Sequence, residues 1–282
     1  MDPAELSRQA DRVAREIGIP PCPEILARFA AEMGQPDPDL RKLAALTGAD
    51  AGLSAALIKT VNSPFYGLAS KATSVQQALS ILGLRAGANL LTGLMLRNAF
   101  PPGTSALMQR FWDDSTRVAQ AAAAVAQRIN GLDVATAHTF ALFRDAGIAV
   151  MLCRFPAYGP VYDRFDTAPG AQVLVVEDEK FRFNHARVGY ALARGWMLPE
   201  PMCLAILHHH AVDPAGGGRR ECEDADPRLV AAGLLAEQVV ALRAGRGLCP
   251  DWKVGEAFVL DALGIDAGEV VGFMQEPLPE AA

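Results

Sequence analysis

Residues 141–152 read ALFRDAGIAVML, a stretch in which apolar residues recur at steps of three and four. This spacing predicts a helix. Two charged residues, Arg144 and Asp145, stand in the middle of the apolar run. Charged side chains are rarely buried unless they are paired or hold a metal ion. If this helix is buried, Arg144 and Asp145 therefore need charged or metal partners.

The helical spacing extends over most of the 282 residues on both sides of this stretch. The chain is rich in alanine and leucine, and only 7% of its residues are aromatic, which favours helix over sheet. One segment is ambiguous: residues 172–183, QVLVVEDEKFRF, contain β-branched valines that also suit a short strand. We predict an all-α protein.

Local signals divide the chain into helices and lobes. Helices are expected to break at Gly48, to stop at Asn62-Ser63-Pro64, and to begin with a capping box from Ser74 to Gln77. The run Pro101-Pro102-Gly103 interrupts the pattern more strongly. We place a boundary there and predict two helical lobes, residues 1–102 and 103–282.

Charge and composition exclude several classes of protein. The net charge of −6 and the isoelectric point near 5.4 argue against nonspecific nucleic-acid binding and against an anionic membrane surface. The five cysteines lie far apart, so neither a zinc knuckle nor a disulfide framework is expected. Apolar runs shorter than ~18 residues and a charged N-terminus predict no membrane helix and no signal peptide. We expect a cytoplasmic protein with no nucleic-acid or membrane partner.

Potential metal ligands occur on several of the predicted helices. Asp145, His185 and the run His208–His210 are the main ones, with Asp114 and Glu237 on an earlier and a later helix. Metal sites in helical bundles are built from side chains that converge from different helices. Such a set of histidines and carboxylates suits a divalent ion.

The order of these segments resembles the HDOD (HD-related output) domain family, the non-hydrolytic relatives of the HD superfamily of metal-dependent phosphohydrolases. In the first lobe the resemblance rests on residues 19–29 (IPPCPEILARF), 43–67 (LAALTGADAGLSAALIKTVNSPFYG) and 73–83 (TSVQQALSILG). In the second lobe it rests on FWDDS, ALFRDAG, EDEKFRFNHARVG, GWMLPEPMCLAILHHH and LLAEQVVAL, which begin at residues 111, 141, 177, 195 and 234. The resemblance implies that residues 173–180 are helical and that the second lobe is an HD-like helical bundle.

The resemblance also implies a remnant of the HD site in this chain. Its members would be Asp114, Arg144, Asp145, His185, His209, His210 and Glu237. Arg144 stands where the hydrolases have a histidine ligand, and Asp114 stands at another histidine position. A guanidinium has no lone pair to offer and stays protonated, so Arg144 cannot bind a cation. We therefore predict no catalytic residue, no metal and no other cofactor.

Arg144 would instead neutralise the carboxylates that a metal ion holds in the hydrolases. Its forked side chain would pair with Asp114 or Asp145, because an unpaired buried carboxylate is costly. The resemblance then implies a bacterial regulatory protein in signal transduction. Its partner would be a signalling protein or a small molecule such as a cyclic dinucleotide, bound in the cleft between the lobes.

An enzymatic alternative stays open at this point. Asp145, His185, His209 and Glu237 could still hold one divalent ion, Fe, Mn or Zn, and support a phosphohydrolase acting on nucleotides or cyclic dinucleotides. A scaffold without any ligand is a third alternative.

Several of these residues also have plain structural alternatives. Asp114 would suit the first turn of a helix, His185 could cap a helix or face solvent, and His138 is expected to pack in the core or lie on the surface. At least one residue of the histidine run is expected to be ordinary surface.

Overall fold

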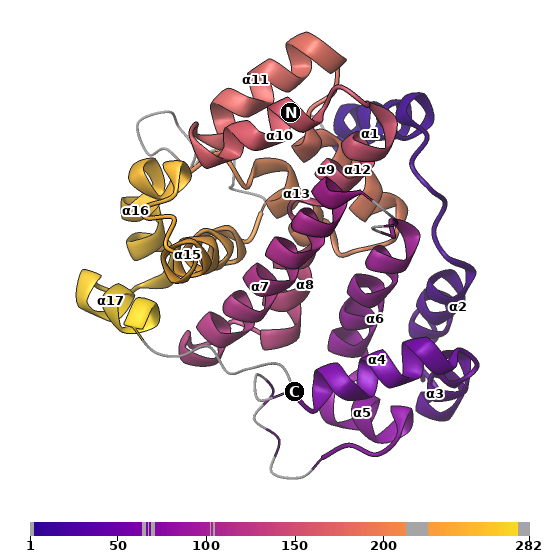
Figure 1. Ribbon diagram of the computed structural model, residues 1–282. Helices are drawn as coiled ribbons and strands as arrows, with labels where there is room; N and C mark the ends of the chain where they lie inside the picture. The colour runs from indigo at the N-terminus through magenta and orange to yellow at the C-terminus, as the bar shows by residue number, and fades with distance from the viewer. Residues whose placement is uncertain are drawn as a thin grey trace.

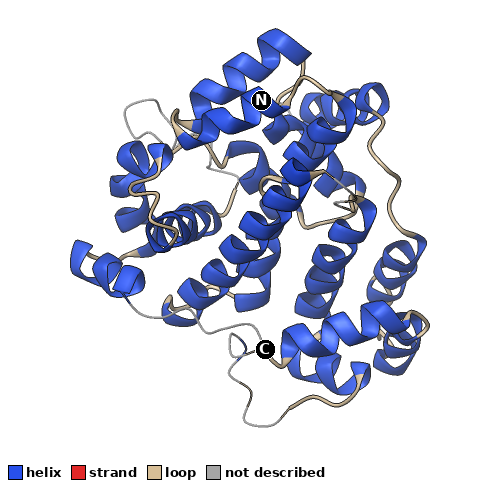
Figure 2. Cartoon of the chain, in the orientation of Figure 1, coloured by secondary structure: helices blue, strands red, loops and turns tan. Residues whose placement is uncertain are grey.

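Helices make up the regular structure throughout the part of the chain that is described. The computed structural model describes residues 3–63, 66, 68, 71–101, 103, 105–212 and 225–275. Within these ranges there is no strand, as Figure 2 shows, and the predicted all-α class is confirmed. The ambiguous valine segment is helical, as the family resemblance implied.

In the chain up to residue 105, which we call the first half, the described residues form six helices. They are α1 (Pro3–Ile17), α2 (Glu24–Met33), α3 (Leu40–Gly48), α4 (Ala51–Val61), α5 (Val75–Leu82) and α6 (Leu84–Ala99). Figure 1 shows α2 to α6 grouped on one side of the molecule, whereas α1 lies apart from them, against α12. Because Pro102 lies outside the described residues, the lobe boundary stays a prediction.

The second half contributes the longest helix and the elements around it. They are α7 (Ala106–Arg128), α8 (Val134–Phe143), α9 (Ala146–Arg154), α10 (Gly159–Tyr162), the 3-10 turn η2 (Asp163–Asp166), α11 (Gly170–Phe181), α12 (His185–Gly195), α13 (Glu200–His208), α15 (Pro227–Arg243), α16 (Pro250–Leu263) and α17 (Ala267–Gln275). Helix α7 packs against α8 and α15, and α6 packs against α8 and so joins the two halves.

Helix starts follow the capping chemistry of the sequence. Short polar side chains accept hydrogen bonds from first-turn N–H groups at α3, α4, α5, α7, α8, α12 and α15. In the predicted capping box, Ser74 Oγ accepts from the Gln77 N–H at 3.1 Å. The Gln77 side chain returns one residue earlier than expected and accepts from the Thr73 N–H. The breaks at Gly48 and Asn62 fall where the sequence predicted them, although Pro64 lies outside the described residues.

Two helix boundaries differ from the expectation. Helix α7 begins at Ala106, so Asp114 lies well inside it, and its alternative role as a first-turn residue is wrong. The run that contains Arg144 and Asp145 is not one helix: α8 ends at Phe143 and α9 begins at Ala146. Asp145 has φ −103° and ψ 10°, outside helical values. The turn directs the charged pair toward the interior of the second half.

The close approach of α9 to α12 explains why glycine follows this turn. A Cβ atom added to Gly147 would lie 1.9 Å from the carbonyl oxygen of His185 and 2.9 Å from the backbone nitrogen of Gly189. Only a residue without a side chain allows the two helices to touch here. The contact brings His185, the first residue of α12, beside Asp145.

The length of the helices and the state of the cysteines can be compared with the expectations from composition in the described residues. No single helix there is long and apolar enough to cross a membrane; α5 and α6 reach that length only together, and they are bent by 120°. The four described cysteines are unpaired, and Cys222 lies outside the described residues.

Candidate functional site

Three histidine rings and one carboxylate converge in the second half of the chain. His185 Nε2 lies 3.4 Å from His209 Nε2 and 3.1 Å from His210 Nε2. Asp145 Oδ1 lies 3.1 Å from His209 Nε2 and 3.7 Å from His185 Nε2. Residues from three separate places in the sequence therefore meet: the turn between α8 and α9, the start of α12 and the end of α13. His185 is fully buried, so its alternatives as a cap or a solvent-facing residue are wrong. Asn184 is the cap instead.

Each histidine ring is oriented by a partner on its other nitrogen. His185 Nδ1 lies 2.8 Å from Glu177 Oε2, His210 Nδ1 lies 2.6 Å from Asp251 Oδ2, and His209 Nδ1 lies 2.7 Å from the Ile206 carbonyl. These partners favour a proton on Nδ1 of His185 and His210, which leaves the Nε2 lone pairs of those two rings facing the common centre. Neutral His209 has one ring proton, which it can donate from Nδ1 to Ile206 or from Nε2 to Asp145. Histidines that ligate metals are held in the same way.

Arg144 bridges two carboxylates beside the histidines. Its Nε lies 2.9 Å from Asp145 Oδ2, its Nη2 lies 2.9 Å from Glu237 Oε2, and its Nη1 donates to the Gly233 carbonyl at 3.0 Å. Only 5% of Arg144 is exposed. All three nitrogens of the guanidinium are thus engaged, and the two carboxylates share one fixed cation.

The charges of the site follow from this arrangement. Burial alone would raise the pKa of Asp145, but Arg144 and then His209 hold it well below its usual value. Burial raises the pKa of Glu237, and Arg144 offsets only part of that rise. Burial, together with His210, lowers the pKa of His209 to about 4, so the ring is neutral at pH 7. Burial opposes a charge on His210 too, but Asp251 raises its pKa above the ordinary value.

Asp114 lies at the rim of the site and does not pair with Arg144. A cavity of about 380 Å³ is lined by Asp114, Arg144, Asp145, His210 and Glu237 among others. The carboxylate of Asp114 faces three other arginines instead: Arg117 at 3.3 Å, Arg246 at 3.5 Å and Arg110 at 4.0 Å. Of the two predicted pairings of Arg144, the one with Asp145 forms, and the one with Asp114 does not. Glu237 takes the second place.

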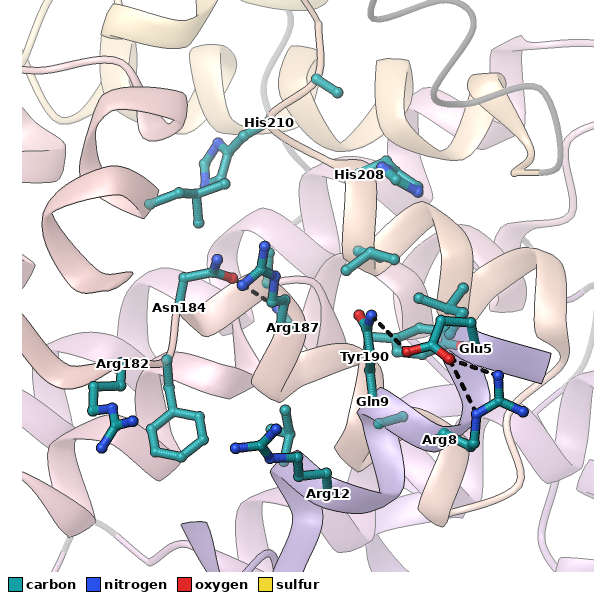
Figure 3. Close-up of a pocket in the computed structure, with 18 of the residues that line it drawn as sticks. Glu5, Arg8, Gln9, Arg12, Arg182, Asn184, Arg187, Tyr190, His208 and His210 are labelled. Carbon is teal, nitrogen blue, oxygen red and sulfur yellow. Dashed lines mark hydrogen bonds and ion pairs between the residues drawn. The ribbon is translucent and has the colours of Figure 1, made fainter. Parts of the chain in front are cut away.

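The histidine run divides between the site and a groove. His209 and His210 belong to the cluster, and His208 does not. His208 lines a groove of about 880 Å³ between α1 and the segment from α11 to α13, and His210 lines both this groove and the cavity of the site. Figure 3 shows His208 and His210 well apart, with Arg187 and Asn184 below them. His208 is only partly exposed, so the expectation that one of the three histidines is ordinary surface stays a prediction.

The sequence reasoning missed the residues that hold the histidines. Glu177 is completely buried, accepts from the Tyr158 hydroxyl and from the His185 N–H, and its pKa is lowered by His185 in spite of burial. The signal for Glu177 was its place at the start of EDEKFRFNHARVG, a segment that carries part of the family resemblance and contains His185. Asp251 gave no signal, because it follows a proline at the start of α16, far from any histidine in the sequence.

The donor set fits one divalent ion. One ligand atom each from Asp145, His185, His209 and His210 lies within 4.8 Å of the others. Neutral imidazole nitrogens and a carboxylate are ligands of zinc, iron and manganese. This set differs from the one we predicted, because Glu237 is paired with Arg144 and His210 stands in its place.

Comparison with known proteins gives the family and the fold. The family model of the HDOD domain matches residues 19–212. An uncharacterized protein of Treponema pallidum (strain Nichols) is 26% identical over 216 residues, which are 73% of this chain and 41% of that protein. The chain therefore spans less than half the length of that relative.

Three solved structures share the fold over most of the chain. An HDOD domain protein with unknown function from Geobacter sulfurreducens has a TM-score of 0.62 and 24% identity, covering 93% of this chain and 92% of its own. A proposed signal transduction protein from Marinobacter aquaeolei VT8 has a TM-score of 0.62 and 25% identity, with 92% and 57% covered. A proposed metal-dependent phosphohydrolase from Shewanella amazonensis SB2B has a TM-score of 0.57 and 19% identity, with 96% and 100% covered. The chain belongs to the HDOD domain family.

Proposed function

We propose that this chain is a non-enzymatic regulatory module. In it, the Arg144 guanidinium supplies the positive charge that a metal ion supplies in the HD hydrolases. The observation that carries the proposal is the double ion pair from Arg144 to Asp145 and Glu237, both at 2.9 Å. The module acts by binding a signalling protein or a small molecule. Its fold likeness to a proposed signal transduction protein supports this role.

Arg144 opposes a metal ion on its side of the site. It supplies no lone pair, and a unit charge at ~4 Å from a divalent ion costs several kcal/mol at an effective dielectric near 20. Arg144 also engages the Glu237 carboxylate. Two of the positions that bind metal in the hydrolases are thereby lost together.

The histidine cluster leaves room for a metal without hydrolysis. Asp145, His185, His209 and His210 would hold the ion. When bound there, a divalent ion would act as a Lewis acid on a phosphoryl oxygen or on water. Four protein ligands are the complete set of a structural zinc site, however, whereas a hydrolytic zinc has three and keeps one position for water. A metal on this cluster would stiffen the second half of the chain.

The convergence of the three Nε2 atoms also favours a second candidate, a metal-dependent phosphohydrolase acting on nucleotides or cyclic dinucleotides. In that case Asp145 would have to share its carboxylate between Arg144 and the ion. The similar fold of the proposed metal-dependent phosphohydrolase from Shewanella amazonensis supports this second candidate.

Turnover measurements on untagged protein decide between the two. The protein would be incubated with bis(p-nitrophenyl) phosphate and with cyclic dinucleotides, in the presence of Mn²⁺, Fe²⁺ or Zn²⁺ in turn. We expect no metal-dependent turnover for the wild type and higher metal affinity for Arg144→His. Turnover by the wild type that is lost in Asp145→Asn but kept in Arg117→Gln, an exposed arginine, would establish the hydrolase instead.

A further inference from the structure

A second cavity lies between four helices, apart from the HD-like site. Its volume is about 540 Å³, within the range of small-molecule sites. The lining residues follow helical spacing on each wall and lie on α4 or just after it, on α6, on α7 and on α8. None of these residues lines the cavity that holds Arg144.

Two of the five buried side-chain atoms that lack a hydrogen-bond partner among the described residues belong to residues of this cavity. His138 Nδ1 and Ser63 Oγ are buried and have no hydrogen-bond partner, although both residues line the cavity. The neighbouring Thr139 Oγ1 is in the same condition. Nearly all buried polar groups in native proteins are paired, and an unpaired one costs about 1–3 kcal/mol. Unpaired groups around one cavity therefore point to a molecule that pairs with them.

The charges around the cavity select the kind of molecule. Lys59 and Arg97 are exposed at its edge, and no acidic side chain occurs among the described residues that line it. The hydroxyls of Thr60 and Thr116 already donate to the carbonyls of Ala56 and Trp112 in their own helices. The interior walls are apolar where Leu53, Leu94 and Leu142 contribute. The cavity thus offers cations at its edge, apolar walls, and a histidine and a serine able to form new hydrogen bonds.

We propose that this cavity binds a small organic anion, a phosphate or carboxylate carried on an apolar or ring-shaped body. Lys59 and Arg97 hold the charged group, and His138 and Ser63 hydrogen-bond to the body. A half-turn of the imidazole about its Cβ–Cγ bond exchanges the positions of Nδ1 and Cδ2, so Nδ1 can turn toward a ligand without backbone movement. The site would serve as the ligand site of the proposed module, but it does not depend on Arg144 or on a metal.

Titration calorimetry with three probes tests this site. The probes are adenosine 5′-monophosphate, indole-3-acetate, and adenosine as the uncharged counterpart of the first. We expect saturable binding of at least one anion, and about tenfold weaker binding of adenosine. The double variant Lys59→Gln/Arg97→Gln should remove the preference for the anion. The relative strength of the two anions then distinguishes phosphate from carboxylate.

Variants of His138 assign the binding to this cavity. His138→Phe should weaken anion binding about tenfold or more, because a hydrogen bond to a buried group is lost. His138→Asn keeps a polar atom near the Nδ1 position and should recover part of the affinity. His208→Phe, a change in the groove beside α1, should bind like the wild type. Absence of saturable binding up to ~10 mM of either anion, equal binding of adenosine, or full affinity in a folded His138→Phe would overturn the proposal. Turnover and metal content are separate readouts, so failure here leaves the proposal on Arg144 standing.

Discussion

At the scale of single residues, the guanidinium of Arg144 sets the charge beside the histidine cluster. Arg144 is 5% exposed and forms ion pairs with Asp145 and Glu237. A buried ion pair is weak evidence for stability, but removal of one partner leaves the other charge uncompensated. The arginine is thus required by the carboxylates around it.

Replacement of Arg144 by alanine tests this requirement. Arg144→Ala should lower the free energy of unfolding by about 3 kcal/mol, because Asp145 and Glu237 are left without their cation. Arg117→Ala, which removes an exposed partner of Asp114, should change it by less than ~0.5 kcal/mol. Urea denaturation at pH 7 measures both. If the two variants unfold at the same urea concentration, Arg144 has no such role.

His138 gives a prediction with the opposite sign. Burial lowers the pKa of His138 to about 4, and its Nδ1 has no partner, so the ring costs stability when nothing is bound. Without ligand, His138→Phe should raise the melting temperature by a few degrees, since the unpaired polar atom is removed. A lower melting temperature would show that the histidine is already satisfied.

The same variant should change the pH dependence of stability. In the unfolded chain a histidine gains its proton near pH 6.5, whereas folded His138 stays neutral until about pH 4. The unfolded state therefore binds more protons between these values, and the wild type loses stability as the pH falls from 6.5 to 4. His138→Phe should remove roughly 2 kcal/mol of that loss. His209, whose pKa is also lowered to about 4, contributes to the slope that remains. An unchanged slope in urea titrations at pH 6.5 and 4.5 would contradict this account.

The residues of the site were predictable in kind, and their pairing was not. The chemistry of arginine was enough to predict that Arg144 neutralises a carboxylate. Arg144 pairs with Glu237 and not with Asp114 because of where α15 and α7 lie relative to it. A single sequence does not give the distances between these helices. Asp251 was missed for the same reason, since it reaches His210 from α16.

At the scale of elements, helix periodicity and capping residues were enough to predict that most segments are helical and where several helices begin or end. The break at Gly48 and the cap at Ser74 were predicted from local chemistry alone. The break at Arg144 and Asp145 was missed because the apolar pattern continues through it and neither residue is a helix breaker. The packing of α9 against α12 sets the position of this break.

Gly147 tests that contact between helices. Gly147→Ala should destabilise the fold by about 2–3 kcal/mol, because its Cβ meets the His185 carbonyl at 1.9 Å and must displace α12. Gly195→Ala in the same pair of helices meets nothing within 4 Å, so it should be neutral or stabilising by up to ~1 kcal/mol. Chemical denaturation compares them. Equal free energies of unfolding for the two variants would mean that the backbones of α9 and α12 are too far apart for a Cβ atom at residue 147 to clash.

At the scale of the whole molecule, the first and second halves of the chain are interlocked. Helix α1 packs against α12, the Trp196 indole donates to the Pro20 carbonyl at 3.1 Å, and α6 packs against α8 (Figure 1). The HD-like site lies within the second half, whereas the proposed anion cavity lies where α4 and α6 meet α7 and α8. Occupation of that cavity would bear on both halves at once, which suits a regulatory module.

Anomalous diffraction from crystals grown with Mn²⁺ or Zn²⁺ tests the central claim most directly. We predict that Arg144 stays within hydrogen-bond distance of Asp145 and Glu237, and that any ion is confined to Asp145 and the three histidines. A fully occupied ion ligated by both Asp145 and Glu237, with the Arg144 side chain turned away, would contradict the claim.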